Sequence, residues 1–253
     1  MNNLFRFRSE IQERQVVAVP DLPGRPIEIP RAELPEFLLE QNHMSDTWDR
    51  MKKAQLTCHG VVVNTFYGFE PEYCDDYRRV EARQAWFVGP VALASCGGVE
   101  RGGGTAAKED GGRCMAWLDT REEGSVLFVC FGGLYGGFAA GKPMLTWPLV
   151  FEQFINERLV VKVAGAGKRV WEGQRSEAEH EKTVVPGEAI ARAVSGFMKA
   201  GGEGETARKK AMELSVVARA AVAKGGPSPR DLDSLIDELL ATRVGATMQD
   251  TPT

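Results

Sequence analysis

The chain has 253 residues, 43% hydrophobic and 26% charged, which is the composition of an ordinary globular protein with room for one large or two smaller domains. Its net charge of -4 gives no electrostatic reason to expect a nucleic-acid partner, and the interspersed charges form no polybasic patch for a membrane surface. No apolar run approaches the length of about 20 residues that crosses a bilayer.

The first residues and the cysteines predict a cytosolic protein. Residues 1–8 are too polar for a secretory signal, and Glu10 and Glu13 argue against a transit peptide. The cysteines are odd in number and never paired at CxxC spacing, so we expect free thiols rather than disulfides or a zinc site. The five are Cys58, Cys74, Cys96, Cys114 and Cys130.

The N-terminal third begins with a proline-rich stretch. Because proline breaks helices and interior strands, residues 1–35 are predicted to be an extended surface segment. Its prolines stand at positions 20, 23, 26, 30 and 35. A helix is expected over residues 45–55, with Ser45 or Asp46 as its N-cap.

An α/β unit follows. The short, continuously apolar run at 60–66 predicts a buried strand. The acidic, proline-first sequence at 70–72 opens a helix that should run to about Arg83. A second short strand is expected at 86–88, which completes a strand–helix–strand unit.

Residues 96–113 are rich in glycine and lack hydrophobic periodicity, so they are predicted to be a flexible linker between two domains. Beyond the linker we expect a short helix over 114–118, a buried strand over 125–131, a short strand over 144–147 and a helix over 150–163.

The C-terminal third is predicted to be helical. Residues 190–198 and 232–240 each carry an apolar stripe at helical spacing. Between them, residues 205–224 predict an alanine-rich helix whose lysines and arginines form a solvated face.

The segment between the two strands of this second half is too short for a complete α/β unit. Only residues 132–143 separate them, five of which are glycine, with no amphipathic pattern. Because a parallel pair needs a crossover of about a dozen residues or more, usually a helix, either the strands are not neighbours or a larger block is missing here.

One sequence motif points to a known family. The segment 141–157, GKPMLTWPLVFEQFINE, resembles the end of the signature box of the plant secondary-metabolite UDP-glycosyltransferases, G-x-P-M-x-x-W-P followed by an acid and Gln. Segments 62–66, 86–91, 114–119, 124–132 and 185–240 resemble other parts of that family in the same order, so that the resemblance covers about four-fifths of the chain.

The resemblance implies an α/β protein of incomplete GT-B fold, with two Rossmann-like halves and a helix-rich C-terminal half. The implied division is a remnant of the acceptor-binding domain over 1–95, the linker over 96–113 and a partial UDP-sugar-binding domain over 114–253. The implied activity is inverting transfer of a hexose, by family default glucose, from UDP to a hydroxyl group of a small acceptor such as a flavonoid or terpenoid. The UDP-sugar would be a co-substrate, and no cofactor, metal, nucleic acid or membrane is expected.

The resemblance also assigns donor-site residues. Glu152 and Gln153 match the pair that binds the sugar hydroxyls, a role that suits a carboxylate acceptor beside an amide that donates and accepts. Trp147 matches the tryptophan that shapes the sugar site. Gly132 and Gly133 match the phosphate-side turn, although Gly133 replaces the family's serine.

Several family features have no counterpart in these residues. The W-A-P-Q and H-C-G-W-N-S parts of the box, which hold uracil and diphosphate, are absent, as is the segment that presents the catalytic base. His43, His59 and His180 lie outside that catalytic context, so the catalytic residues stay unassigned. The alternative to an enzyme is a non-catalytic remnant or an interaction partner of a full-length relative.

Overall fold

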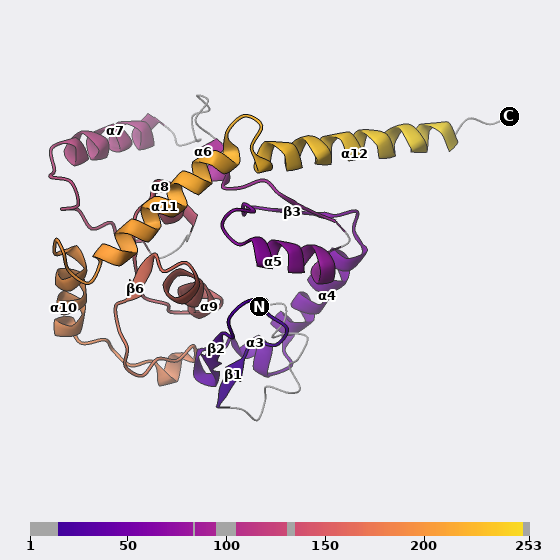
Figure 1. Cartoon of the computed structure of the whole chain (residues 1–253). Helices are drawn as coiled ribbons and strands as arrows, with labels where there is room; N and C mark the ends of the chain where they lie inside the picture. Colours follow the sequence, from indigo (N-terminus) through magenta and orange to yellow (C-terminus); the bar gives the residue numbers. More distant parts are fainter. Residues whose placement is uncertain (1–14, 83, 95–104, 131–134, 250–253) are drawn as a thin grey trace.

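The computed structural model describes residues 15–82, 84–94, 105–130 and 135–249. Within these residues the strands form three separate two-stranded sheets, one antiparallel and two parallel, which helices connect and cover (Figure 1). The architecture is therefore α/β, with short separate sheets in place of one continuous sheet.

The N-terminal segment folds as a small hairpin with its own core, so the prediction of an extended surface segment is wrong for the described residues 15–35. Val17 lies opposite Ile29 in the antiparallel pair, and both side chains are buried with Leu38 and Phe37. The prolines interrupt neither strand from within. Pro30 ends the second strand, where a missing N–H costs little. The elements are β1 (Val16–Ala18), β2 (Glu28–Pro30), the 3-10 turn η1 (Arg31–Glu33) and α3 (Glu36–Leu39).

Helix α4 (His43–Thr57) confirms the predicted helix but has a different cap. The side-chain oxygen of Asn42 accepts hydrogen bonds from the backbone N–H groups of Met44 and Ser45, at 3.0 and 3.1 Å. Ser45 returns the contact by accepting from the Asn42 N–H at 2.7 Å. Ser45 thus occupies the N3 position of a capping box, and Asn42, which the prediction missed, is the N-cap.

The predicted α/β unit is confirmed. Its two strands pair parallel, with Val62 opposite Trp86, and the connecting helix opens on Pro71 as expected. The first strand is shorter than predicted, and Val62 is exposed. The elements are β3 (Val61–Val63), α5 (Pro71–Asp76), the π-helical turn η2 (Tyr77–Glu81) and β4 (Ala85–Phe87).

Cys74 lies in the core of this unit, and burial raises the pKa of its thiol to about 12. Because the thiolate is the form that reacts with maleimides, Cys74 should stay unlabelled in the folded protein at about pH 8, whereas the exposed Cys114 should be labelled within minutes. Peptide mass spectrometry measures both sites, and unfolding in denaturant should make them equally reactive. Equal labelling in the native state would contradict this packing.

Part of the predicted linker is helical. Helix α6 (Val91–Ala94) lies before the linker. Helix α7 (Thr105–Asp119) includes residues 105–113 of the linker and continues through 114–118, so the helix predicted there is confirmed. Residues 95–104 lie outside the described residues. The run Thr-Ala-Ala-Lys-Glu-Asp contains good helix formers, and the two glycines that follow cost only about 1 kcal/mol each in a helix.

The predicted strand over 125–131 is not formed. Residues 125–130 adopt neither helix nor strand, and the side chains of Leu127, Phe128 and Val129 are exposed. Phe131 lies outside the described residues. A strand is stabilised by pairing with a neighbour, and within the described part of the chain no strand pairs with this segment.

The second parallel pair confirms the predicted strand over 144–147 and adds a partner for it. Thr146 lies opposite Arg169. The strands approach closely at Gly167, where an added Cβ would lie 2.6 Å from the Met144 carbonyl oxygen. The predicted helix over 150–163 is confirmed from residue 153 onward. The elements are α8 (Tyr135–Ala140), β5 (Met144–Thr146), α9 (Gln153–Arg158), the π-helical turn η3 (Leu159–Val163) and β6 (Gly167–Arg169).

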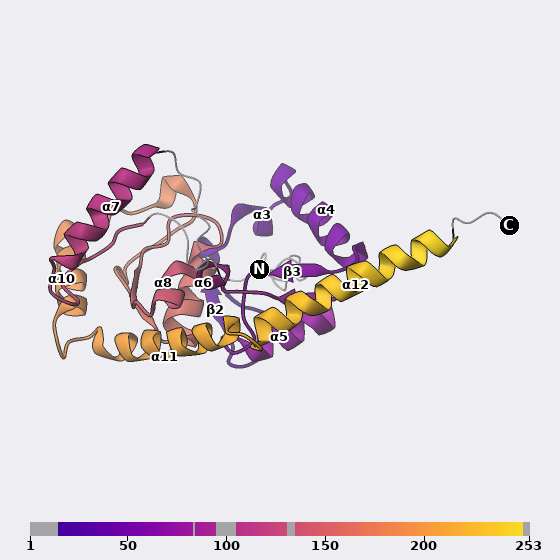
Figure 2. The ribbon, with the colours of Figure 1, turned by 90° about the horizontal axis from the view of Figure 1, so that it is seen from above.

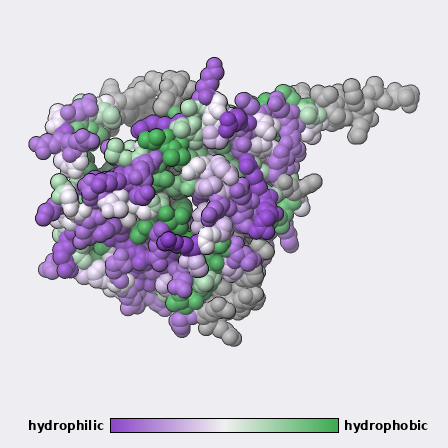
Figure 3. All heavy atoms as spheres, in the orientation of Figure 1, coloured by the Kyte–Doolittle hydropathy of each residue, from purple (hydrophilic) through white to green (hydrophobic). Residues whose placement is uncertain are grey.

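The last third is helical as predicted, with α10 (Gly187–Met198), α11 (Glu205–Val222) and α12 (Pro227–Gln249) after the short turn η4 (Glu179–Glu181). The buried side of α11 consists of alanines and a serine, which lets α8 pack closely against it. Figure 3 shows apolar side chains on the face that α11 crosses, and the exposed side chains of α11 include Met212 and Val216.

Helix α12 is anchored at its first turns and then projects away from the body of the molecule (Figures 1 and 2). Asp231 accepts a hydrogen bond from the backbone N–H of Phe87 at 2.7 Å, and Ser228 donates to the Gly89 carbonyl at 2.6 Å. The predicted apolar stripe is therefore mostly exposed, as shown by Leu232 and Ile236.

Candidate functional site

The candidate sugar-contacting residues lie directly after β5, on the turn that leads into α9. Because β5 and β6 are parallel, Thr146 and Arg169 stand together at the carboxyl edge of the pair. Ligands of open α/β sheets bind outside this edge. Trp147 is the next residue, and 46% of its surface is exposed.

The turn itself is fixed by short-range contacts. Phe151 adopts a left-handed backbone conformation, with φ of 53°. The Gln153 side-chain oxygen accepts a hydrogen bond from the backbone N–H of Leu149 at 2.9 Å, which closes the turn. The Glu152 side chain is exposed and makes no capping hydrogen bond. The turn thus leaves a carboxylate and the Gln153 amide nitrogen available to hydroxyl groups of a ligand.

Behind the turn lies a buried ionic network that sequence reasoning missed. Glu157, one helical turn after Gln153, accepts a hydrogen bond from the Thr146 hydroxyl at 2.9 Å. Its other oxygen lies 2.5 Å from an Arg175 nitrogen and 2.8 Å from Arg169 Nε.

The network continues into the N-terminal hairpin. Arg158, which is 2% exposed, contacts one carboxylate oxygen of Glu33 at 2.5 Å, and Arg175 contacts the other at 2.7 Å. Arg158 also donates to the backbone carbonyls of Glu28 and Phe154, at 2.9 and 2.8 Å. Burial lowers the pKa of the Arg158 guanidinium, and the Glu33 carboxylate opposes that shift.

The other glycines and histidines considered from the sequence are not part of the turn after β5. Gly132 and Gly133, the predicted phosphate-side turn, lie outside the described residues. His59 pairs with Glu238 at 3.1 Å and stacks on Trp86, while His43 and His180 are exposed on α4 and η4. His59 therefore has a structural contact, whereas His43 and His180 are solvated.

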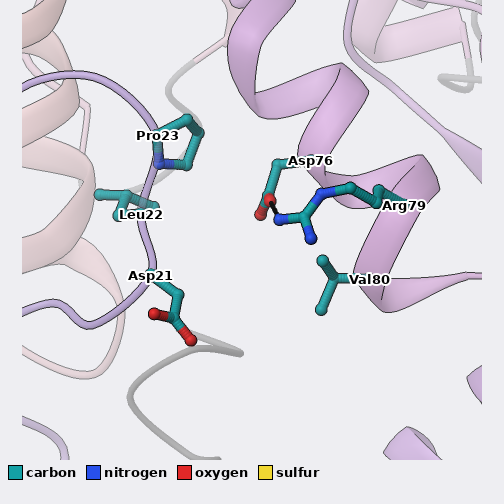
Figure 4. Close-up of a pocket in the computed structure, with 6 residues that line it drawn as sticks. All are labelled: Asp21, Leu22, Pro23, Asp76, Arg79 and Val80. Carbon is teal, nitrogen blue, oxygen red and sulfur yellow. Dashed lines mark hydrogen bonds and ion pairs between the residues drawn. The ribbon is translucent and has the colours of Figure 1, made fainter.

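A cavity of about 520 Å³ lies elsewhere, between the loop after β1 and the helix of the first α/β unit (Figure 4). Asp21, Leu22 and Pro23 face Asp76, Arg79 and Val80 across it. Arg79 is already paired with Asp76 at 2.5 Å. None of the residues predicted to contact the sugar lines this cavity.

Among the described residues no helix is long and apolar enough to cross a membrane. Groups of three or more potential metal-ligating side chains are also absent from the described part of the chain.

Comparison with known proteins agrees with the sequence motif. No protein-family model matches the chain. UDP-glycosyltransferase 73C5 of Arabidopsis thaliana is 28% identical over 315 residues, an alignment that covers 90% of this chain and 63% of that protein. The chain is thus similar to plant UDP-glycosyltransferases over nine-tenths of its length. It spans less than two thirds of the length of the UDP-glycosyltransferases that it matches.

Solved plant UDP-glycosyltransferases share the fold. A crystal structure of Glycyrrhiza uralensis UGT73P12, complexed with glycyrrhetinic acid 3-O-monoglucuronide, superposes with a TM-score of 0.80 at 22% identity and covers 98% of this chain and 68% of that one. Medicago truncatula UGT71G1, complexed with UDP-glucose, gives 0.65 at 18% identity, covering 93% and 68%. The predicted incomplete GT-B fold is confirmed.

The length of the alignment also bears on the short segment between the two C-terminal strands. The aligned stretch is 315 residues long, whereas this whole chain has 253, so the Arabidopsis protein carries internal residues that this chain lacks. Within the described residues β5 pairs with the downstream β6 and not with the segment 125–130, so the two predicted strands are not neighbours, which is the first of the two explanations for the short segment.

Proposed function

We propose that the chain serves transfer of a hexose, glucose by family default, from UDP to a hydroxyl group of a small-molecule acceptor. The observation that carries the proposal is the turn after β5, where Trp147 and Glu152 are exposed at the carboxyl edge of a parallel pair. The Medicago neighbour was solved with UDP-glucose, which supports this class of donor.

In such a transfer the acceptor oxygen attacks the anomeric carbon, the bond from that carbon to the UDP oxygen breaks, and a base takes the hydroxyl proton. We assign to this chain only the hold on the sugar. The Glu152 carboxylate would accept from two adjacent hydroxyls, the Gln153 amide would donate to a third group, and Trp147 would form one wall. We assign no base to this chain.

The proposed domain roles, acceptor class and location follow from the same resemblance. Residues 1–95 would form the acceptor side and residues 114–253 the donor side of the cleft. A small acceptor such as a flavonoid or terpenoid fits the ligand of the Glycyrrhiza neighbour, which is a glycyrrhetinic acid derivative. A cytosolic location is supported by the thiols of Cys58, Cys74 and Cys114, which form no disulfide.

A second candidate function is that of a non-catalytic remnant that associates with a full-length relative. The specific observation in its favour is the segment 125–130, whose apolar side chains are exposed and whose backbone joins no sheet in the described residues. A protein with that much uncovered apolar chain gains stability from a partner.

Titration calorimetry of the purified chain with UDP-glucose and with UDP separates the two candidates. Saturable binding of UDP-glucose supports the donor-binding proposal and makes acceptor screening worthwhile. If a demonstrably folded sample binds neither ligand, the enzyme proposal fails and the family relationship describes ancestry alone.

Replacing Glu152 by Gln should weaken UDP-glucose binding by roughly tenfold or more, because a hydrogen bond to a charged group contributes about 1.5–3 kcal/mol. Binding of UDP, which lacks the hexose, should not change. Glu188→Gln on α10 is the matched control, since that side chain is also exposed. Equal losses for UDP and UDP-glucose would place Glu152 outside the sugar site.

A further inference from the structure

The buried ionic network occupies the opposite end of the helix that begins at the candidate sugar turn. Gln153, the first residue of α9, closes the turn through its contact with Leu149. Glu157 and Arg158, the last two residues of the same helix, are both buried in the network. Gln153 and Glu157 are about one helical turn apart on the same short helix, so any tilt of α9 also moves Gln153 and the turn before it.

The partners of α9 come from distant parts of the sequence. Glu33 lies 125 residues before Arg158 and 142 before Arg175, on the turn η1 that follows the N-terminal hairpin. It contacts Arg158 with one carboxylate oxygen and Arg175 with the other. One N-terminal carboxylate therefore joins α9 to the segment after β6.

The network is balanced in charge once its exposed edge is included. Two buried carboxylates, of Glu33 and Glu157, and the exposed carboxylate of Glu172 face the guanidinium groups of Arg158, Arg169 and Arg175. A balanced cluster does not require an external anion, so we do not interpret these arginines as a phosphate site. Buried ion pairs often add little net stability, and fixing one arrangement is a role documented for some of them.

We propose that Glu33 is a positioning residue for the candidate sugar site. By holding Arg158 and Arg175, it sets the orientation of α9 and hence of Trp147, Glu152 and Gln153. Recognition of the sugar part of the donor then depends on an N-terminal residue that does not touch the sugar. This inference rests on the proposed function for its ligand, but its structural part stands without any ligand.

The structural part is tested by hydrogen exchange in the ligand-free protein. The reporter is the Leu149 amide, whose hydrogen bond to Gln153 closes the turn. In Glu33→Gln this amide should exchange at least tenfold faster relative to amides of α10. The control variant Glu203→Gln breaks the exposed ion pair to Lys168 and should leave the exchange unchanged.

The loss of one carboxylate leaves excess buried positive charge, so a second variant guards against misfolding. The double variant Glu33→Leu/Arg158→Met removes an oppositely charged pair together and should retain native helical content. It should also show the faster Leu149 exchange. Unchanged exchange at Leu149 in a folded double variant would overturn the proposal.

Ligand titration tests the functional part. Each Glu33 variant should lose affinity for UDP-glucose by tenfold or more and keep its affinity for UDP within twofold. General loosening of the fold would weaken the binding of both ligands equally, and that result would overturn the positioning role. If the unaltered protein binds neither ligand, the proposed function fails and the Leu149 exchange alone decides whether Glu33 positions the turn.

Discussion

Replacing Arg158 by alanine should lower the free energy of unfolding by about 3–5 kcal/mol, because removing one partner of a buried ion pair leaves the other charge uncompensated. Arg158 contacts Glu33 and also satisfies the carbonyls of Glu28 and Phe154. Its removal thus opens the junction between the N-terminal hairpin and α9. Urea denaturation followed by circular dichroism measures the change.

The control for this variant is Lys168→Ala, which breaks the exposed pair with Glu203 on the neighbouring strand β6. Exposed pairs contribute about 0–1 kcal/mol. If the two substitutions cost the same, the network around Arg158 is not buried as described.

Phe154→Ala should be similarly severe, at about 3–5 kcal/mol, because it removes a large side chain from a packed interior. Phe154 is 1% exposed and lies under the Arg175 guanidinium, 5.8 Å from its ring centroid. The loss should appear as a lower denaturant midpoint with an unchanged slope.

Phe128→Ala is the matched control, since the same side chain is deleted at a site that is 84% exposed. It should change the free energy of unfolding by less than about 0.5 kcal/mol. A large effect at Phe128 would mean that the segment 125–130 is covered in solution, which would favour association with a partner.

The elements that sequence predicts well are those whose pattern is local. The strand–helix–strand unit ending at β4 follows from short apolar runs and the acid-proline start at Glu70-Pro71. The C-terminal helices follow from apolar residues at helical spacing. The candidate sugar-contacting turn can be predicted because its motif, from Gly141 to Gln153, is contiguous in sequence, and the motif follows a strand's carboxyl end in the structure.

The errors arise where an element depends on a partner. Residues 125–130 have the composition of a buried strand, but composition does not supply the neighbouring strand that would pair with them. The stripe beginning at Leu232 has helical spacing, yet most of its side chains are exposed, because the side of α12 that faces the body is held by polar contacts such as that of Asp231 with Phe87. Pairing and coverage are properties of the whole fold, which a window of ten residues does not contain.

The network behind the sugar turn was out of reach for a related reason. Glu33 and Arg158 are ordinary charged residues in a chain where a quarter of all residues are charged, and such residues are usually solvated. Nothing local marks them as partners across 125 residues. Their burial follows only once the hairpin packs against α9.

Saturation-transfer NMR with UDP-glucose tests most directly the claim that this chain keeps the sugar-contacting end of a donor site. The hexose protons should receive more saturation than the uracil protons, and Trp147→Ala should abolish the difference. Stronger saturation of uracil than of the hexose, or none on either, would contradict the claim.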